Sequence, residues 1–312
     1  MGPNKELFFS IFNSIDFHKI IDHPNILIAA RFWEEERYDA AKTCYRLMRS
    51  IDDLIDDYKA EHRIIRPEER ESFSREVNNW INMIRDNTEK HAFQKELAGC
   101  ISKFKMPLWP LEDFAKSMLY DIDHSGFSTL SDFIEYSRGA SVAPASIFVH
   151  LNSISRKNGN YMAPPFDVRE AATPCAMFSY FVHIIRDFQK DQRNNLNYFA
   201  DDLIKANNLT GELINKIAHG AKPGLDFRNL VKVYYDHADE YRQKTIEMIG
   251  RIAPLLEPRY QLSLDIIFNL YLMVFERIDI EKGNFTTEEL NPTPEEAKER
   301  VYNTIVKFTE HL

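Results

Sequence analysis

Helical periodicity is the feature of this sequence that most restricts its fold. Apolar residues recur every three to four positions over long stretches, and few segments alternate between apolar and polar residues. Glycine is scarce, with 10 in 312 residues. The linkers are short, and no repeat or low-complexity tract separates two halves. The sequence therefore predicts an all-α protein of eight or more helices, folded as a single domain over residues 1–312.

The expected helices follow from apolar spacing together with proline and acidic start signals. Residues 26–58 form one long helix or two in succession, and residues 130–153 form a helix with a kink at Pro144. A turn is expected at residues 123–126 and a loop at 158–165. The other expected helices are 68–87, 111–121, 169–192, 203–208, 212–219, 226–252, 258–278 and 293–312.

Charge and cysteine content exclude several classes of protein. The formal net charge is −9 and no basic stripe is present, which argues against nucleic-acid binding. Cys44, Cys100 and Cys175 lie far apart, so neither a zinc site nor a disulfide framework is expected. Residues 1–17 lack a secretory signal, and no stretch reaches the roughly 20 apolar residues that span a bilayer. We expect a soluble protein of the reducing cytoplasm, with peripheral membrane contact left open.

The first candidate site is a run of four aspartates within residues 52–57. On a helix Asp52 and Asp56 share a face, and Asp53 lies close to it. Such carboxylates repel one another unless a cation sits among them. Mg²⁺ takes one or two carboxylates together with substrate phosphates and water. A solvated acidic helix end is the alternative interpretation of this run alone.

A second acidic face favours the metal interpretation. His183, Asp187 and Asp191 recur at intervals of four after the apolar residues 176–182. Two such faces can meet across a helical bundle and hold several Mg²⁺ ions, or Mn²⁺ in their place, against a diphosphate. The predicted metal ligands are Asp52, Asp53, Asp56, Asp187 and Asp191, of which all but Asp53 are also predicted to be catalytic.

Cationic and aromatic residues complete this hypothesis. Arg49 and Arg186 are candidate phosphate partners, with surface ion pairs as the alternative. An aromatic pocket would suit a carbocation, because the face of a ring attracts positive charge. The candidates, each of which also fits an ordinary core, are Phe178, Tyr180, Phe181, Phe268, Tyr271 and Phe275.

These motifs resemble those of the squalene/phytoene synthases. Residues from Pro24-Asn25 through Tyr45, Arg49 and Asp52 to Asp56 resemble the flap and first aspartate-rich motif of that family. Residues 183–191 with Tyr198-Phe199 are similar to its second motif. Residues 136–141 resemble a family helix whose small side chains let a prenyl tail pass close to the backbone. The resemblance runs from about residue 24 to about residue 280, in order.

The resemblance implies a class I isoprenoid synthase: a single all-α domain with a central cavity. Two prenyl diphosphates would condense head to head through a cyclopropylcarbinyl diphosphate, giving a squalene-, phytoene- or dehydrosqualene-like product. The substrate-binding residues that it implies are Tyr45, Arg49, Tyr136, His183, Arg186, Tyr198 and Tyr271. The sequence does not fix the prenyl chain length, the use of NADPH or the oligomeric state.

The chain departs from the family pattern at several positions. His183 replaces an asparagine, Asn195-Leu196 replaces Gly-Arg, and Ala200 replaces a proline. In the flap, residues 32–34 read Phe-Trp-Glu in place of Leu-Leu-Pro. The lost arginine motivates one alternative, a terpene cyclase or a prenyltransferase with a non-isoprenoid acceptor. A non-catalytic assembly or lipid-binding protein is the other, although such relatives usually lose the aspartates that this chain keeps.

Overall fold

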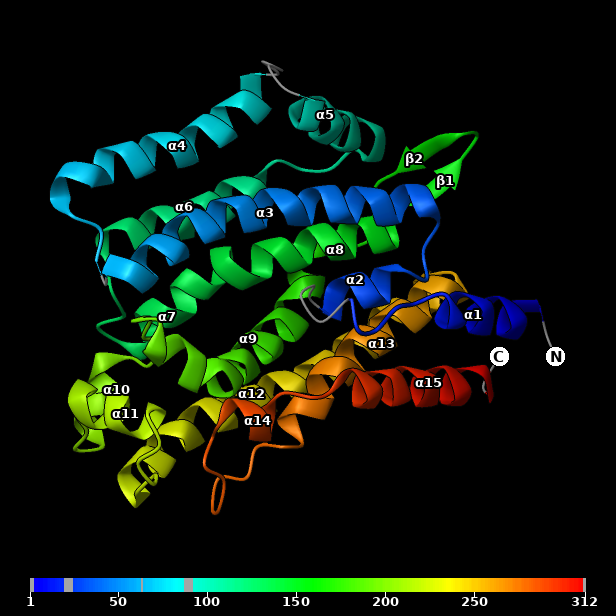
Figure 1. Cartoon of the computed structure of the whole chain (residues 1–312). Helices are drawn as coiled ribbons and strands as arrows, with labels where there is room; N and C mark the ends of the chain where they lie inside the picture. Colours follow the sequence, from blue (N-terminus) through cyan, green and yellow to red (C-terminus); the bar gives the residue numbers. More distant parts are fainter. Residues whose placement is uncertain (1–2, 20–24, 63, 87–91, 311–312) are drawn as a thin grey trace.

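The computed structural model describes residues 3–19, 25–62, 64–86 and 92–310, and within them it confirms the all-α prediction (Figure 1). The helices pack around one contiguous hydrophobic core. They are α1 (Pro3–Asn13), α2 (Asn25–Ala30), α3 (Glu35–His62), α4 (Pro67–Asp86), α5 (Ala92–Phe104), α6 (Trp109–Asp123), α7 (Leu130–Ser137), α8 (Ala143–Ser153), α9 (Val168–Arg193), α10 (Asp201–Ala206), α11 (Gly211–Ala218), α12 (Leu225–Ile252), α13 (Pro258–Phe275), α14 (Thr287–Leu290) and α15 (Pro294–Glu310).

Helix α9 lies at the centre of the bundle. It begins at an N-cap, where the Asp167 carboxylate accepts a hydrogen bond from the Glu170 amide at 2.9 Å. Its apolar face packs against α12, α8 and α13. Figure 1 shows α3, α6 and α8 on one side of the molecule and α9, α12 and α13 on the other. Helices α3 and α9 therefore face each other across the middle of the fold.

The helix is interrupted at residues 31–34, between α2 and α3, so residues 26–58 belong to two helices rather than one. The Trp33 indole donates to Ser263 Oγ at 2.9 Å. The Glu34 carboxylate accepts from Tyr260 Oη at 2.5 Å and lies 3.1 Å from Arg259 Nη1. Trp33 and Glu34 are two of the three positions at which the flap differs from the family pattern. Through these contacts they hold the connection between α2 and α3 against α13.

The expected kink at Pro144 is wrong in its position. Helix α7 passes into a π-helical segment, Arg138–Val142, and α8 begins at Ala143, ahead of the proline. The Ala143 amide donates to the Arg138 carbonyl, five residues back. A proline cannot continue the normal ladder, so the wider turn forms just before it.

The expected loop at 158–165 is also wrong in part. Ser155–Lys157 (β1) and Asn160–Met162 (β2) pair as an antiparallel hairpin. Asn158 and Gly159 both have positive φ, 51° and 81°. An Asn-Gly pair is the usual two-residue hairpin turn, and this signal was missed.

Most other helix boundaries agree with the prediction to within two or three residues, but three helices were not predicted. These are α1, α5 and α14. The predicted ends at Asn87 and Leu312, and Pro24 of the flap motif, lie outside the described residues. No helix in the described ranges is both long and apolar enough to cross a bilayer.

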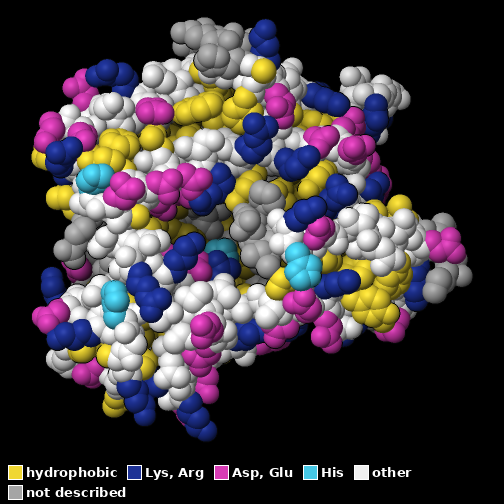
Figure 2. Space-filling view, in the orientation of Figure 1, with side chains coloured by type: hydrophobic (Ala, Val, Ile, Leu, Met, Phe, Trp, Pro, Cys, Tyr) yellow, Lys and Arg dark blue, Asp and Glu magenta, His cyan; other side chains and the backbone are white. Residues whose placement is uncertain are grey.

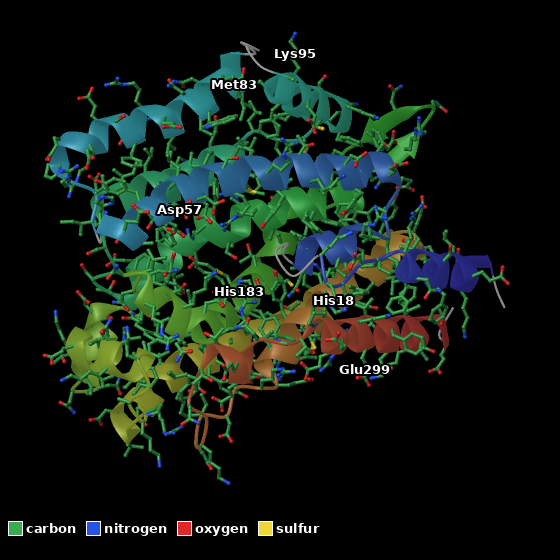
Figure 3. All side chains as sticks on the ribbon, viewed as in Figure 1. His18, Asp57, Met83, Lys95, His183 and Glu299 are labelled. Atoms are coloured by element: carbon green, nitrogen blue, oxygen red, sulfur yellow. The ribbon has the colours of Figure 1, made fainter. Side chains whose placement is uncertain are left out.

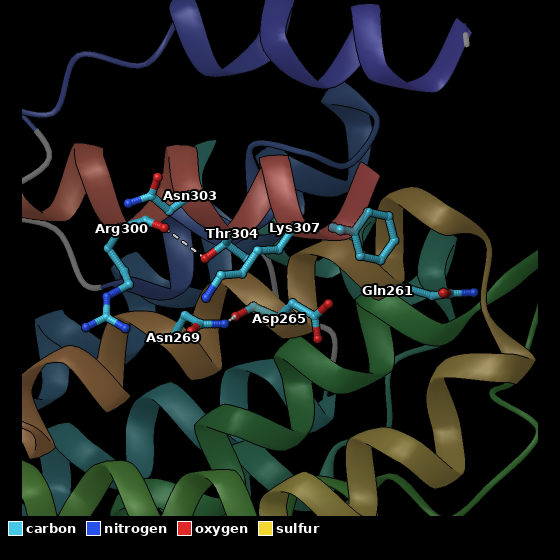
Figure 4. Close-up of a pocket in the computed structure, with 8 residues that line it drawn as sticks. Gln261, Asp265, Asn269, Arg300, Asn303, Thr304 and Lys307 are labelled. Carbon is cyan, nitrogen blue, oxygen red and sulfur yellow. Dashed lines mark hydrogen bonds between the residues drawn. The ribbon is translucent and has the colours of Figure 1, made fainter. Parts of the chain in front are cut away.

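A polar cavity of about 420 Å³ lies between α13 and α15, away from the acidic motifs (Figure 4). Asp265 faces it from α13, and burial raises the pKa of its carboxyl to about 6. The folded state therefore favours the protonated acid more than the unfolded chain does. Stability is lost as the pH rises from about 4 through 6.

We expect Asp265→Asn to raise the free energy of unfolding by about 1–3 kcal/mol at pH 8 and to leave it unchanged at pH 4. Denaturant titrations at the two pH values measure this difference. Asp236→Asn, which alters an exposed i,i+4 pair with Lys232, should change stability by less than about 0.5 kcal/mol at both. An equal gain at pH 4 and pH 8 would rule out the titration of Asp265 as the cause.

Candidate active site

A second cavity, of about 350 Å³, lies between α3 and α9. Figure 2 shows a hollow with acidic side chains along one edge and a histidine near the other. Figure 3 labels Asp57 on α3 and His183 on α9; His183 lines the cavity and Asp57 does not. The predicted site residues that line the cavity are Tyr45, Arg49, Asp52, Asp56, Tyr136, His183, Asp187, Asp191, Tyr198 and Tyr271.

Asp53 and Arg186 do not line the cavity. Asp53 pairs with Arg49, whose second nitrogen lies 2.7 Å from Asp52 Oδ2. Arg186 Nε and Nη2 donate to the two oxygens of Asp187, at 2.8 and 2.6 Å. In this structure both arginines are therefore bound to the carboxylates of their own motif. Arg49 is half-exposed and can turn toward a phosphate.

Burial and mutual repulsion raise the pKa values of three carboxyl groups that line the cavity. Burial, together with the charge of Asp56, raises the pKa of Asp52 to about 7. Burial and the charge of Asp121 raise the pKa of Asp56 to about 6. The pKa of Asp191 lies well above its ordinary value because of burial and the nearby charge of Asp187. More negative charge gathers here than the resident cations neutralise.

Asp187 behaves differently from these three residues. Burial alone would raise its pKa, but the hydrogen bonds and charge of Arg186 outweigh burial and leave the pKa below its ordinary value. Asp187 is therefore ionised at neutral pH. The pKa of His183, one turn before it, falls to about 3 through burial and the charge of Arg186, so the imidazole is neutral.

The donor set suits a hard divalent cation, because it consists of carboxylate oxygens whose repulsion a cation would relieve. Within the described ranges, however, no three side chains of His, Cys, Asp or Glu come close enough to hold one ion by themselves. A metal here would need oxygens from a bound diphosphate and water as well. This matches the coordination that Mg²⁺ adopts in phosphate-transfer sites. The metal ligands remain a prediction.

The inner part of the cavity is apolar. Its wall includes Met48, Phe114, Met118, Ala145 and Phe148. Of the six aromatic candidates, Tyr180 and Tyr271 line it, whereas Phe178, Phe181, Phe268 and Phe275 are not among its lining residues. Phe178, for example, packs in the core against Phe268 and Phe275. For those four residues the ordinary-core interpretation was correct.

Sequence reasoning missed a buried lysine and a partly buried aspartate beside the cavity. Lys59 follows Asp56 by one turn on α3 and is 5% exposed. Asp121 comes from α6, and its Oδ1 atom lies 3.9 Å from Lys59 Nζ. A signal existed, because Phe114, Met118 and Asp121 recur at helical spacing and the first two line the cavity. A lone aspartate ending an apolar stripe was not recognised.

The departures after the second motif have local explanations. Asn195, in place of glycine, has a φ of 60°, a conformation that asparagine tolerates better than most residues. The side-chain amide nitrogen of Asn195, Nδ2, donates to the Ala60 carbonyl oxygen at 3.1 Å. This bond joins the end of α9 to α3. The Ala200 amide donates to Tyr234 Oη at 2.9 Å, a bond that a proline could not make.

The expectation for the small residues after Tyr136 is only partly supported. Ala140 and Ser141 line the cavity. Gly139 instead packs against α6, where an added Cβ would overlap Ser117 Oγ and the Asp113 carbonyl oxygen. Its missing side chain serves helix packing, so Gly139 gives no passage to a prenyl tail.

Solved structures with the same architecture were found by comparison. A dehydrosqualene synthase in complex with a ligand superposes with a TM-score of 0.72 at 13% identity, over 99% of this chain and 98% of that one. YisP from Bacillus subtilis subsp. subtilis strain 168 gives 0.60 at 12% identity, covering 96% of each chain. Squalene synthase HpnC from Alicyclobacillus acidocaldarius gives 0.53 at 12% identity, over 77% of this chain and 93% of that one.

At such low identity these likenesses establish the fold alone. No curated protein matches the sequence. The model of the squalene/phytoene synthase family, however, matches residues 23–296, which include both acidic helices, the π-helical segment and α13. The chain therefore belongs to the squalene/phytoene synthase family and is a prenyltransferase.

Proposed function

We propose that this protein uses Mg²⁺ to ionise a prenyl diphosphate and joins two prenyl chains head to head. The observation that carries the proposal is the arrangement of the cavity. Asp52 and Asp56 on α3 face Asp187 and Asp191 on α9 across one hollow whose inner wall is apolar. A diphosphate fits the acidic rim only with cations between them, and a prenyl tail fits the interior.

The residues have distinct tasks in this mechanism. Bound Mg²⁺ would neutralise the diphosphate and so make it a better leaving group. The four aspartates would hold the cations, and Arg49 would reach the diphosphate from the half-exposed rim. The allylic C–O bond breaks, and its electron pair leaves with the diphosphate. The allylic cation stays between Tyr180, Tyr271 and Phe148, where water is scarce and ring faces attract positive charge.

Condensation then needs a second prenyl diphosphate in the same cavity. Its double bond attacks the cation, and loss of a proton closes a cyclopropylcarbinyl diphosphate. That intermediate loses its diphosphate and rearranges to a linear cation, which would give an unsaturated hydrocarbon by losing a proton or a reduced one by accepting hydride from NADPH. We propose that one domain, residues 1–312, carries out both steps in the cytoplasm.

The test is a product assay with the purified protein. Prenyl diphosphates of 10, 15 and 20 carbons are supplied with Mg²⁺, Mn²⁺ or EDTA, each with and without NADPH. We expect diphosphate release that requires a divalent cation and a hydrocarbon that contains two prenyl units. A requirement for NADPH would identify a reduced product. Failure to release diphosphate from any chain length would contradict the proposal.

One observation favours a second function. Leu196 stands where the family pattern has an arginine, so the chain lacks at this position a cation that could hold a second diphosphate. A terpene cyclase, or a prenyltransferase with a non-isoprenoid acceptor, needs to bind only one diphosphate. In the same assay such an enzyme would give a product that contains one prenyl unit.

A further inference from the structure

A chain of buried polar side chains runs along the cavity wall. Lys59 Nζ donates to the His124 carbonyl at 2.8 Å and lies 3.9 Å from Asp121 Oδ1. The other carboxylate oxygen, Asp121 Oδ2, accepts the hydroxyl proton of Tyr136 at 2.6 Å. Tyr136 is 7% exposed and lines the cavity. Three helices, α3, α6 and α7, thus meet at one carboxylate.

The position of one proton follows from counting donors. A phenol has one proton, and Tyr136 gives it to Asp121. The Tyr136 proton therefore points away from any ligand in the cavity and toward Asp121.

Two consequences follow for a ligand in the cavity. Tyr136 has no proton to offer a diphosphate, so it does not serve as an anion-binding donor. Its phenol oxygen instead keeps only lone pairs for the cavity, and these attract positive charge. The orientation depends on Asp121 remaining an acceptor, and Lys59 supplies the charge that lets a carboxylate stay buried there.

We propose that Lys59 and Asp121 are positioning residues that hold the hydroxyl of Tyr136 as an acceptor toward the prenyl cation. The inference rests on the proposed function for the identity of that cation. It assigns a role to two residues outside both aspartate-rich motifs. It also separates Tyr136 from the groups that bind diphosphate.

A binding measurement tests this role without turnover. The probe is a prenyl dimethylammonium ion that mimics the cation, compared with its uncharged carbon isostere, by calorimetry on the whole protein. We expect Asp121→Asn and Tyr136→Phe each to weaken ammonium binding by about tenfold and to leave the isostere unchanged. The double variant should bind no more weakly than either single variant, because both substitutions break the same chain.

Kinetics and a matched control complete the design. With a substrate identified, kcat should fall by about tenfold to a hundredfold in both variants at unchanged KM. Thermal stabilisation by Mg²⁺ with inorganic pyrophosphate should not change. Asp123→Asn, on the same helix but in an exposed pair with Arg70 at 3.2 Å, should match the wild-type protein in every measurement.

Several outcomes would overturn the inference. Wild-type ammonium affinity in Asp121→Asn would do so, as would additive losses in the double variant. If Mg²⁺ with inorganic pyrophosphate no longer stabilised Asp121→Asn against heat, Asp121 would belong to diphosphate binding instead. If Asp121→Asn does not fold, the paired variant Lys59→Met/Asp121→Asn removes both buried charges together and should show the same selective loss. If the wild-type protein releases no diphosphate but still binds the ammonium ion more tightly than its uncharged isostere, only the proposed function is contradicted.

Discussion

Asparagine in place of Asp52 or Asp187 is expected to reduce diphosphate release by about a hundredfold to a thousandfold. Each substitution removes one anionic oxygen ligand from the rim where cations and diphosphate must meet. Steady-state rates of pyrophosphate release at saturating Mg²⁺ measure the loss. Asp57→Asn is the control, because Asp57 belongs to the same aspartate run but is exposed and does not line the cavity.

The two substitutions should change stability in opposite directions. Asp52 has a pKa of about 7 in the fold, so its ionised form destabilises the native state above that pH. Without metal, Asp52→Asn should raise the free energy of unfolding by about 1 kcal/mol or more at pH 8 and have no such effect at pH 4. Asp187→Asn breaks a bidentate ion pair and leaves Arg186 without its carboxylate partner. It should lower stability by about 1–3 kcal/mol at pH 8.

These two results together separate a binding site from ordinary surface charge. Equal activity losses with opposite stability changes are expected where activity depends on the carboxylates as ligands and not on how much each contributes to stability. If Asp52→Asn lowered stability at pH 8, the repulsion inferred among these carboxylates would be refuted. If Asp57→Asn lost as much activity as Asp52→Asn, the geometric distinction between them would fail.

Gly139→Ala should destabilise the protein by about 3 kcal/mol or more, or prevent folding altogether. The added methyl group would overlap Ser117 Oγ, which can rotate, and the Asp113 carbonyl oxygen, which belongs to the backbone of α6 and cannot. Relief would require α6 to move away from the π-helical segment. Soluble yield and denaturant midpoints measure the effect.

Gly99→Ala in α5 is the matched control for this substitution. An added Cβ there meets no atom within 4 Å. Alanine favours a helix over glycine, so we expect this change to be neutral or to stabilise by up to about 1 kcal/mol. Equal behaviour of the two variants would show that α6 and the π-helical segment are not packed as closely as the structure has them.

The sequence predicted the fold class and most long helices because those helices carry apolar stripes that repeat with the helical period. The errors have physical origins. The π-helical segment depends on how the chain accommodates Pro144, which periodicity does not encode. The hairpin was missed because its strands have only three residues each. Helix α5 carries just two fully buried side chains, so its pattern is weak.

Sequence reasoning found cavity-lining residues that belong to a local pattern and missed residues brought together by tertiary structure, while the roles of the predicted site residues stay a prediction. Asp52 and Asp56 are recognisable from their spacing along one helix. Asp121 lies beside the cavity on α6, and nothing near it in the sequence indicates its partner Lys59 on α3. Gly139, which was expected beside a prenyl tail, packs against α6 instead, and that contact also depends on tertiary structure.

The hydrogen bond from Asn195 to the Ala60 carbonyl has a consequence for how the empty site behaves. The side chain of Asn195 links the end of α9 to the last turns of α3, so this bond opposes separation of the two helices at that end. The pKa values of Asp52, Asp56 and Asp191 are raised, so the metal-free site lowers its charge by taking up protons. A cation would displace those protons, and proton release should therefore accompany cation binding at neutral pH.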